Sequence, residues 1–209
     1  HRVHFRKIIL VGHSFGSNIS WTEAGTYQDV DGVVLTAISH DQTPPAAPLT
    51  VTDSWPAEMD PKFASAGFPP GYLTNIPGKR GELFYHLPGA DPQAIAIDEA
   101  NKDVLPFGVL LDQFTTYDLT RNIHVPVLNV VGNYDTLACE LPSCLEAGTL
   151  ANEASFYSPD ACYTLIVVPN TGHATNLHEY APWWYRKAQA WVRNVAGGRA
   201  HGCGRCPEL

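Results

Sequence analysis

Residues 12–16 carry a pattern that can do nucleophilic chemistry. Gly12-His13-Ser14-Phe15-Gly16 reads G-x-S-x-G, and it follows the apolar run Ile8-Ile9-Leu10-Val11 directly. A tight strand-to-helix turn presents the central serine hydroxyl at the carboxyl end of a sheet and leaves no room for side chains two residues away on either side. The backbone N–H of Phe15 can then face a developing oxyanion. The pattern predicts Ser14 as a nucleophile and Phe15 as an oxyanion donor.

A serine hydroxyl is a weak nucleophile at neutral pH and needs a base beside it. Asp135 follows the apolar segment that ends at Val131, and His173 follows the one that ends at Val168. Because parallel strands end at one sheet edge, Ser14, Asp135 and His173 are predicted to meet there in the chain order Ser, Asp, His. The expected roles are nucleophile for Ser14, orienting acid for Asp135 and general base for His173.

Each partner of the serine has a competitor. Asp41 follows the second apolar segment and is the alternative acid, while His178 is the alternative base. His178 is expected on the following helix, where it packs or caps. His13 is expected to be a packing position. The nine histidines form no H-E-x-x-H or comparable group, so the sequence predicts no metal and no cofactor.

Four short, apolar, β-branched segments predict buried parallel strands. They are Lys7–Val11, Gly32–Thr36, Val125–Val131 and Tyr163–Val168. Helices are predicted for Asn18–Tyr27 and Pro182–Val195, the second from tryptophan, valine and alanine residues at helical spacing. Strands that alternate with helices indicate an α/β fold, with a parallel sheet covered by helices on its faces.

The segment between the second and third strands differs in composition. It holds eleven of the seventeen prolines and many scattered aromatic residues. Since a structureless loop of this length is unusual in a compact domain, we expect a folded, mainly helical and loop-built lid. Helices are plausible at Asp91–Lys102 and Leu105–Phe114. The predicted organisation is a core of residues 1–39 and 121–197, a lid at 40–120 and a flexible tail at 198–209.

Composition excludes several classes of function. The chain has 209 residues, with 13 Lys and Arg against 21 Asp and Glu and a formal net charge of −8. That balance offers no basic footprint for nucleic-acid phosphates. The apolar runs are too short to span a bilayer. Neither a nucleic-acid partner nor a membrane span is therefore expected, and the predicted partner is the small-molecule substrate of the chemistry at Ser14.

The five cysteines leave two interpretations open. Cys139, Cys144 and Cys162 are either three buried thiols or include one disulfide that joins Cys162 to Cys139 or Cys144. A disulfide would imply an oxidising compartment. Cys203-Gly204-Arg205-Cys206 is a CxxC in a glycine-rich tail without a βαβ setting, so a thioredoxin-like redox site is not expected there.

These motifs resemble, in order, those of the α/β-hydrolase family. Gly12–Gly16 corresponds to its nucleophile elbow, Asp31–Thr36 to the next strand, Val125–Asp135 to the strand that ends in the acid, and Gly172-His173 to the histidine loop. The loop Thr171–His178 is similar to that of uncharacterised fungal, often secreted, serine hydrolases. The match covers nearly the whole chain apart from the tail after about Gly197.

The resemblance implies a serine hydrolase that cleaves a carboxylic ester through an acyl-enzyme, with an apolar acyl substrate suggested by the aromatic lid. Amide, thioester or C–C cleavage would use the same three residues. The family has further strands before the elbow and a loop that supplies a second oxyanion N–H, and both are expected to be missing here. The alternative is a catalytically silent fragment or interaction module that associates through an exposed edge strand. An extracellular location is favoured over a cytoplasmic one.

Overall fold

The core of the protein is a four-stranded parallel sheet. The structure is a computed structural model, and it describes residues 4–40, 53–139, 144, 150, 152–197, 206 and 207. The strands are β1 (Ile9–His13), β2 (Gly32–Thr36), β6 (Val127–Gly132) and β7 (Thr164–Val168), in the spatial order β1-β2-β6-β7. All three neighbouring pairs are parallel. The α/β fold class and the four predicted strands are confirmed.

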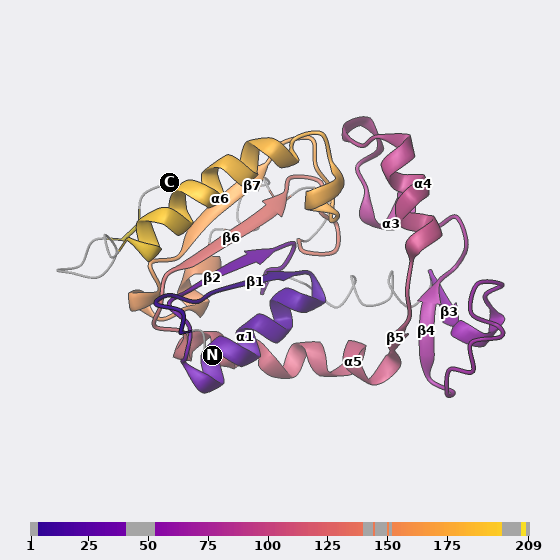
Figure 1. Cartoon of the computed structure of the whole chain (residues 1–209), viewed down its shortest axis with the longest axis horizontal. Coiled ribbons are helices and arrows are strands. Elements are labelled where there is room, and N and C mark those ends of the chain that lie inside the picture. The colour runs from indigo at the N-terminus through magenta and orange to yellow at the C-terminus, as the bar shows by residue number, and fades with distance from the viewer. Residues whose placement is uncertain are drawn as a thin grey trace.

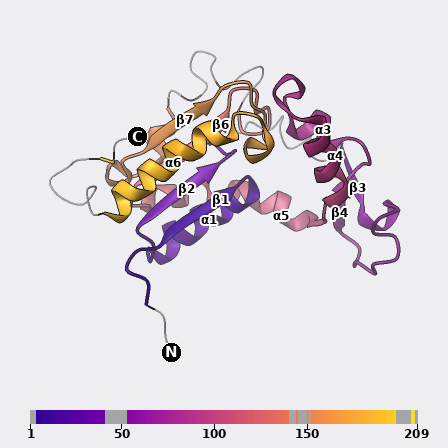
Figure 2. The same ribbon diagram turned by 45° about the horizontal axis from the view of Figure 1, so that its top comes forward.

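Helices cover both faces of this sheet. Helix α1 (Phe15–Tyr27) packs on one face, where Trp21 is fully buried beneath the sheet. Helix α6 (Ala181–Ala196) covers the other face with Trp184 and Trp191, as Figures 1 and 2 show. Both helices lie where the sequence predicts them. The inner strands β2 and β6 are buried along their whole length, which is why their sequences are mostly apolar. The buried Asn129 of β6 is hydrogen-bonded, since its Nδ2 donates to Ile38 O at 2.9 Å.

The segment between β2 and β6 stands where the sequence predicts a lid, and we call it the cap. Its regular elements are β3 (Ser54–Pro56), β4 (Tyr72–Asn75), α3 (Arg80–Phe84), α4 (Pro92–Asn101), β5 (Leu105–Pro106) and α5 (Phe107–Asp112). Short 3-10 helices span Ala57–Met59, Leu87–Gly89 and Gln113–Asn122 in this segment, and Glu153–Phe156, Pro159–Ala161 and Thr175–Leu177 later in the chain.

Two details of the cap differ from the expectation. The cap contains an antiparallel sheet in the order β3-β4-β5, whose strands of two to four residues are too short to show a sequence period. The helix expected over Leu105–Phe114 begins only at Phe107, because Pro106 disfavours a helical conformation at the residue before it and Leu105–Pro106 form β5. The helix expected at Asp91–Lys102 is present as α4. The domain boundaries stay predictions, since residues 41–52 lie outside the described part of the chain.

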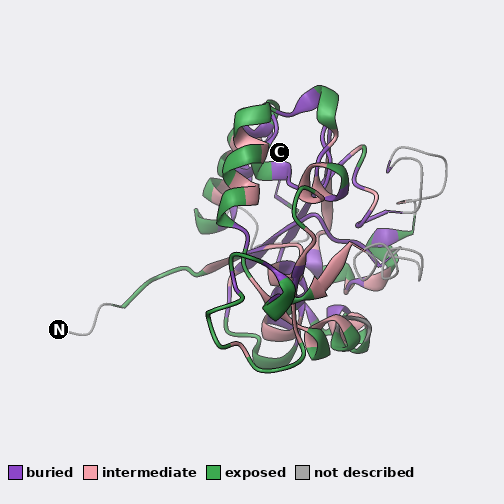
Figure 3. Cartoon of the chain, turned by 90° about the vertical axis from the view of Figure 1, so that its right-hand side faces the viewer, coloured by how far each residue is buried: buried purple, intermediate pink, exposed green. Residues whose placement is uncertain are grey.

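The cap lies beyond the carboxyl ends of the core strands (Figures 1 and 2). Figure 3 shows that its outer segments are largely exposed, whereas the buried residues concentrate in the core. The link between α3 and α4 is fixed to the core, because Ala174 N–H donates to Phe84 O at 2.8 Å and Glu179 N–H donates to Gly89 O at 3.0 Å. The cap therefore forms one wall of whatever site lies at that sheet edge.

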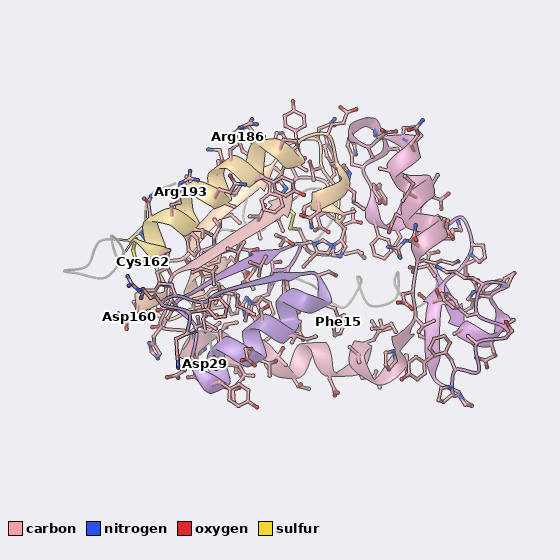
Figure 4. The ribbon with its side chains drawn as sticks, viewed as in Figure 1. Phe15, Asp29, Asp160, Cys162, Arg186 and Arg193 are labelled. Atoms are coloured by element: carbon pink, nitrogen blue, oxygen red, sulfur yellow. A yellow bond between two sulfur atoms is a disulfide. The ribbon has the colours of Figure 1, made fainter. Side chains whose placement is uncertain are left out.

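Four cysteines form two disulfides, and neither is the expected pairing. Cys139 is bonded to Cys144, and Cys162 is bonded to Cys206. The expectation failed because Cys206 is 44 residues from Cys162, a separation that carries no local signal. Figure 4 places Cys162 at the end of the sheet opposite Phe15. Cys203 lies outside the described residues.

Among the described residues, none of the helices combines the length and the apolar character that a bilayer crossing requires.

Candidate functional site

Ser14 occupies a strained turn between β1 and α1. Its φ is 52° and its ψ is −116°, a positive-φ conformation outside the usual regions that a serine adopts only when its surroundings impose it. The Ser14 N–H donates to Thr36 O at 2.8 Å, which ties the turn to β2. Phe15 is the first residue of α1 and lies at the end of that helix nearest the cap (Figure 4). The N–H groups of a first helical turn have no intrahelical acceptor, so they can bind an anion.

The two glycines of the motif are not equivalent. A Cβ on Gly12 would lie 2.4 Å from Gly16 O and 2.6 Å from the Cα of Ser17, both backbone atoms that cannot move aside. A Cβ on Gly16 would meet nothing within 4 Å. The sequence-based expectation that both positions lack room is therefore right for Gly12 and wrong for Gly16, because Gly16 already lies on an open side of α1.

This difference predicts opposite outcomes for two alanine variants. Gly12→Ala should lower the free energy of unfolding by about 1–3 kcal/mol, the usual cost of forcing extra atoms into a packed site, and should displace Ser14. Gly16→Ala should be neutral or stabilising by up to about 1 kcal/mol, since alanine is the better helix former. Urea denaturation of both variants measures this, and equal destabilisation would contradict the geometry.

Asp135 lies in the turn after β6 and is 1% exposed. Its Oδ1 accepts hydrogen bonds from the backbone N–H groups of Leu137 at 3.1 Å and Ala138 at 2.9 Å. The same oxygen is 2.9 Å from His173 Nδ1. Its Oδ2 is buried without a hydrogen-bond partner among the described residues. The carboxylate is thus held in one orientation by main-chain donors and by the imidazole.

His173 connects the acid to the serine. Its Nε2 lies 2.7 Å from Ser14 Oγ, while its Nδ1 faces Asp135. The ring is buried against Phe84 of the cap, with ring centroids 5.6 Å apart. Because Asp135 can only accept at Nδ1, the neutral ring carries its proton there and offers a lone pair at Nε2 to the serine hydroxyl. The three predicted residues and Phe15 therefore lie together at the carboxyl edge of the sheet.

The structure describes only one of the two alternative residues, Asp41 and His178. Asp41 lies outside the described residues. His178 does not lie on the following helix, as expected, but just before it, because α6 begins only at Ala181. Its Nε2 accepts from Gly172 N–H at 3.0 Å and from His86 N–H at 3.1 Å, and its Nδ1 donates to Ala174 O at 2.9 Å.

His178 therefore joins the cap to the histidine loop instead of contacting Ser14. Both backbone donors need the lone pair of a neutral ring, and burial, as the first cause, lowers the pKa of His178. Sequence reasoning missed this role. The spacing His173 to His178 offers a signal only when the intervening residues are known to form a tight turn.

His13 is also neutral. Thr36 Oγ1 donates to Gly12 O at 3.1 Å, so it accepts from His13 Nδ1 at 2.8 Å. Burial, and then the neighbouring His173, lower the pKa of His13 to about 4. Because this folded-state pKa lies below the ordinary value of 6.5, an unfolded chain binds a proton more readily than the folded one between these pH values.

The free energy of unfolding should consequently fall as the pH drops from about 6.5 towards 4, and His13 should account for up to about 3 kcal/mol of that fall. Above pH 6.5 both states are neutral at this ring and the contribution is fully present. The free energy of unfolding, measured by urea denaturation at each pH, should depend less steeply on pH in His13→Asn than in wild type. The exposed His4 provides a matched control, and an unchanged slope in His13→Asn would contradict the assignment.

Two cavities open beside Ser14. The first, of about 410 Å³, is lined by His13, His173, Asn176 and Leu177 together with cap residues. The second, also of about 410 Å³, lies between Phe15 and the cap residues Leu73, Leu105 and Leu110. Phe84, Arg80 and Asp98 line both. The arrangement therefore offers a nucleophile with its base, a helix N-terminus for an anion and space on both sides for a bound molecule.

The chain matches the alpha/beta hydrolase family over residues 2–184. Among solved structures, the monoacylglycerol lipase of Paleococcus ferrophilus is similar with a TM-score of 0.58 and 18% identity, over 91% of this chain and 68% of that one. A thermophilic esterase from Thermogutta terrifontis has a TM-score of 0.58 and 20% identity, over 91% and 66% of the two chains.

An E-2-(acetamidomethylene)succinate hydrolase is 25% identical with a TM-score of 0.53, over 92% of this chain and 68% of that one. The chain thus spans about two thirds of the length of these structures. No curated protein is significantly similar to it in sequence.

Proposed function

Because the chain belongs to the alpha/beta hydrolase family, we propose that it is a serine hydrolase that cleaves carboxylic esters through an acyl-enzyme. The observation that carries this proposal is the continuous contact from Asp135 to His173 at 2.9 Å and from His173 to Ser14 Oγ at 2.7 Å. In this proposal Ser14, His173 and Asp135 are the catalytic triad, and the Phe15 N–H is an oxyanion donor.

Acylation would start at the Ser14 hydroxyl. His173 Nε2 takes the proton as Oγ attacks the carbonyl carbon, and the ring becomes an imidazolium. Asp135 stabilises that cation through the hydrogen bond at Nδ1. The carbonyl oxygen gains negative charge and faces the Phe15 N–H at the start of α1, where the helix dipole also favours an anion.

The acyl-enzyme would then form with release of the alcohol, and water would hydrolyse it. The imidazolium gives its proton to the leaving alkoxide, the C–O bond breaks, and the alcohol departs. Water then takes the place of the alcohol, and His173 removes its proton as it attacks the acyl-enzyme. The carboxylic acid leaves, and Ser14 regains its proton. Amides and thioesters would react through the same residues.

Several observations support an ester as substrate. Two of the similar structures are a monoacylglycerol lipase and an esterase. The cavities beside Ser14 include the apolar side chains Phe84, Leu105 and Leu110, which suit a mainly apolar acyl group. Two disulfides in 209 residues favour an oxidising, extracellular location, which we propose on that ground.

A fluorophosphonate probe tests the proposal. The probe should label the native chain once, and peptide mapping by mass spectrometry should place the adduct on Ser14, with loss of p-nitrophenyl butyrate hydrolysis in proportion. Activated serine is required for such labelling, so the heat-denatured chain is the control. An adduct on another serine, or hydrolysis that persists after complete labelling, would refute the assignment.

The alternative role rests on β1. This strand has a neighbour on one side within the described sheet, and Val11 on it is 65% exposed. An apolar edge strand can pair with a second chain, including another copy of this one. A folded chain that the probe does not label, and that associates in sedimentation experiments, would favour this interaction role over catalysis.

A further inference from the structure

In the proposed function, on which this inference rests, the two cavities beside Ser14 hold different parts of the substrate. His173 lines the first cavity and not the second, whereas Phe15 lines the second and not the first. His173 must reach the leaving oxygen to protonate it, so the leaving alcohol occupies the first cavity. The acyl chain then extends past Phe15 into the second, which we call the acyl cavity.

Arg80 of α3 is held rigidly in the wall of the acyl cavity. Its Nε and Nη2 donate to both oxygens of Asp98 at 2.8 Å and 2.9 Å, and its Nη1 donates to Asn75 Oδ1 at 2.8 Å. The guanidinium also lies over the Phe84 ring, 4.6 Å from its centroid. Tyr85 OH donates to Asp98 Oδ2 at 3.0 Å and fixes the acid in turn. A side chain with so many contacts has already lost its rotamer entropy before a ligand binds.

This arrangement leaves Arg80 with donors to spare. A guanidinium has five N–H groups, and the three bonds to Asp98 and Asn75 use one on each nitrogen. One N–H on Nη1 and one on Nη2 therefore remain for another acceptor. Asn75 lines the acyl cavity and not the first one, so the Nη1 side of the fork is turned to the acyl cavity.

The charge around these donors is balanced. The acyl cavity is lined by two cations, Arg80 and Lys102, and two anions, Asp98 and Asp103. Lys102 is itself paired with Asp60 at 2.8 Å. A carboxylate on the acyl chain would meet Asp98 and Asp103 beside the arginine, whereas a carbonyl oxygen can accept its N–H groups without adding charge.

We propose that Arg80 selects the acyl group, and that the enzyme prefers acyl chains with a neutral carbonyl oxygen, such as a ketone, over plain alkyl chains and over chains that end in a carboxylate. Leu73, Leu105 and Leu110 bury the methylene groups between that carbonyl and the ester. Arg80 is a specificity-determining residue in this proposal and takes no part in bond cleavage.

Matched ethyl esters test the acyl preference. Ethyl levulinate and ethyl isocaproate have the same number and connectivity of heavy atoms, and levulinate has a ketone oxygen where isocaproate has a methyl group. A second ketone and alkyl pair, each one methylene longer, serves in case the carbonyl must reach farther from Ser14 to Arg80. Monoethyl succinate tests an acyl chain that ends in a carboxylate. Each kcat/KM is measured by pH-stat and divided by the rate constant for hydroxide-catalysed hydrolysis of the same ester, which removes differences in intrinsic reactivity.

At least one ketone ester should be favoured about tenfold or more over its alkyl partner, as expected for a hydrogen bond from a charged donor. Monoethyl succinate should be the poorest substrate. Arg80→Met should bring the ratio close to one by lowering kcat/KM for the ketone ester, with little change for the alkyl ester. Lys79→Met, at the exposed neighbouring cation, should keep the wild-type ratio.

A wild-type ratio near one for both pairs would overturn the inference and leave the proposed hydrolase intact, and so would an unchanged ratio in Arg80→Met. If Arg80→Met does not fold by circular dichroism, Arg80→Lys provides the comparison, because lysine keeps the charge without the planar fork. Acetonyl butyrate and isobutyl butyrate differ by the same ketone oxygen and methyl group, placed on the alcohol instead of the acyl group. A preference that appears only in that pair would overturn the assignment of the cavities. Absence of all turnover would refute the proposed function itself.

Discussion

The variant Ser14→Ala should hydrolyse p-nitrophenyl butyrate about a million times more slowly than the native chain at saturating substrate. The expected loss is that of removing the nucleophile from the proposed triad, because the members of such a triad act as one unit. Ser14 Oγ lies 2.7 Å from His173 Nε2. Without Oγ, the imidazole has no hydroxyl to deprotonate, and the remaining donors stabilise only the slow attack of water.

The fold of Ser14→Ala should be unchanged. The turn is held by backbone contacts, including the Ser14 N–H bond to Thr36 O, and alanine tolerates the same backbone conformation as serine. Ser155→Ala is the matched control, since that exposed serine bonds only to Asn152 O among the described residues. Circular dichroism and turnover number measure the two effects. A Ser14→Ala variant with activity within tenfold of native would exclude Ser14 as the nucleophile.

Asp135→Asn and Asp135→Ala should differ in their loss of activity. Loss of the acid commonly lowers kcat about ten-thousandfold when the imidazole adopts the wrong tautomer. In this chain, however, Oδ1 accepts from Leu137 and Ala138 N–H groups, so the asparagine must place its carbonyl oxygen there. That oxygen can still accept from His173 Nδ1, and the correct tautomer is kept.

Asp135→Asn should therefore lose mainly the negative charge, with kcat lowered by roughly a hundred- to a thousandfold, less than the tautomer-dependent loss. Its amide nitrogen would replace Oδ2, which is buried and has no partner among the described residues, so stability should fall by about 1–3 kcal/mol. In Asp135→Ala, kcat should fall about ten-thousandfold. Single-turnover rates and urea midpoints measure both. Asp112→Asn, at the end of α5, is the control, and equal losses for the two Asp135 variants would contradict this reasoning.

The sequence predicted those parts of the site that follow from strand order. Apolar runs identified the four core strands, and the residues just beyond three of them are Ser14, Asp135 and His173. In a parallel sheet, strand ends share one edge, so position along the chain translates directly into proximity. Helices α1 and α6 were predictable for a related reason, because one face of each packs on that sheet.

Other parts depend on tertiary contacts that no local pattern records. Arg80 meets Asp98 because α3 and α4 pack together, and a separation of 18 residues gives no periodic signal. His178 reaches His86 across 92 residues. Cysteine pairing likewise follows the path of the chain, which is why the predicted partners of Cys162 were wrong.

The bond between Cys162 and Cys206 makes a covalent ring of the segment that carries β7, His173 and α6. A single peptide-bond cut anywhere inside that ring leaves both pieces attached to one another through sulfur. Such nicked molecules would migrate as one species until a reductant is added, and the imidazole would remain tethered to the sheet. The protein thus tolerates a proteolytic cut between Cys162 and Cys206 that would separate the two pieces of a linear chain.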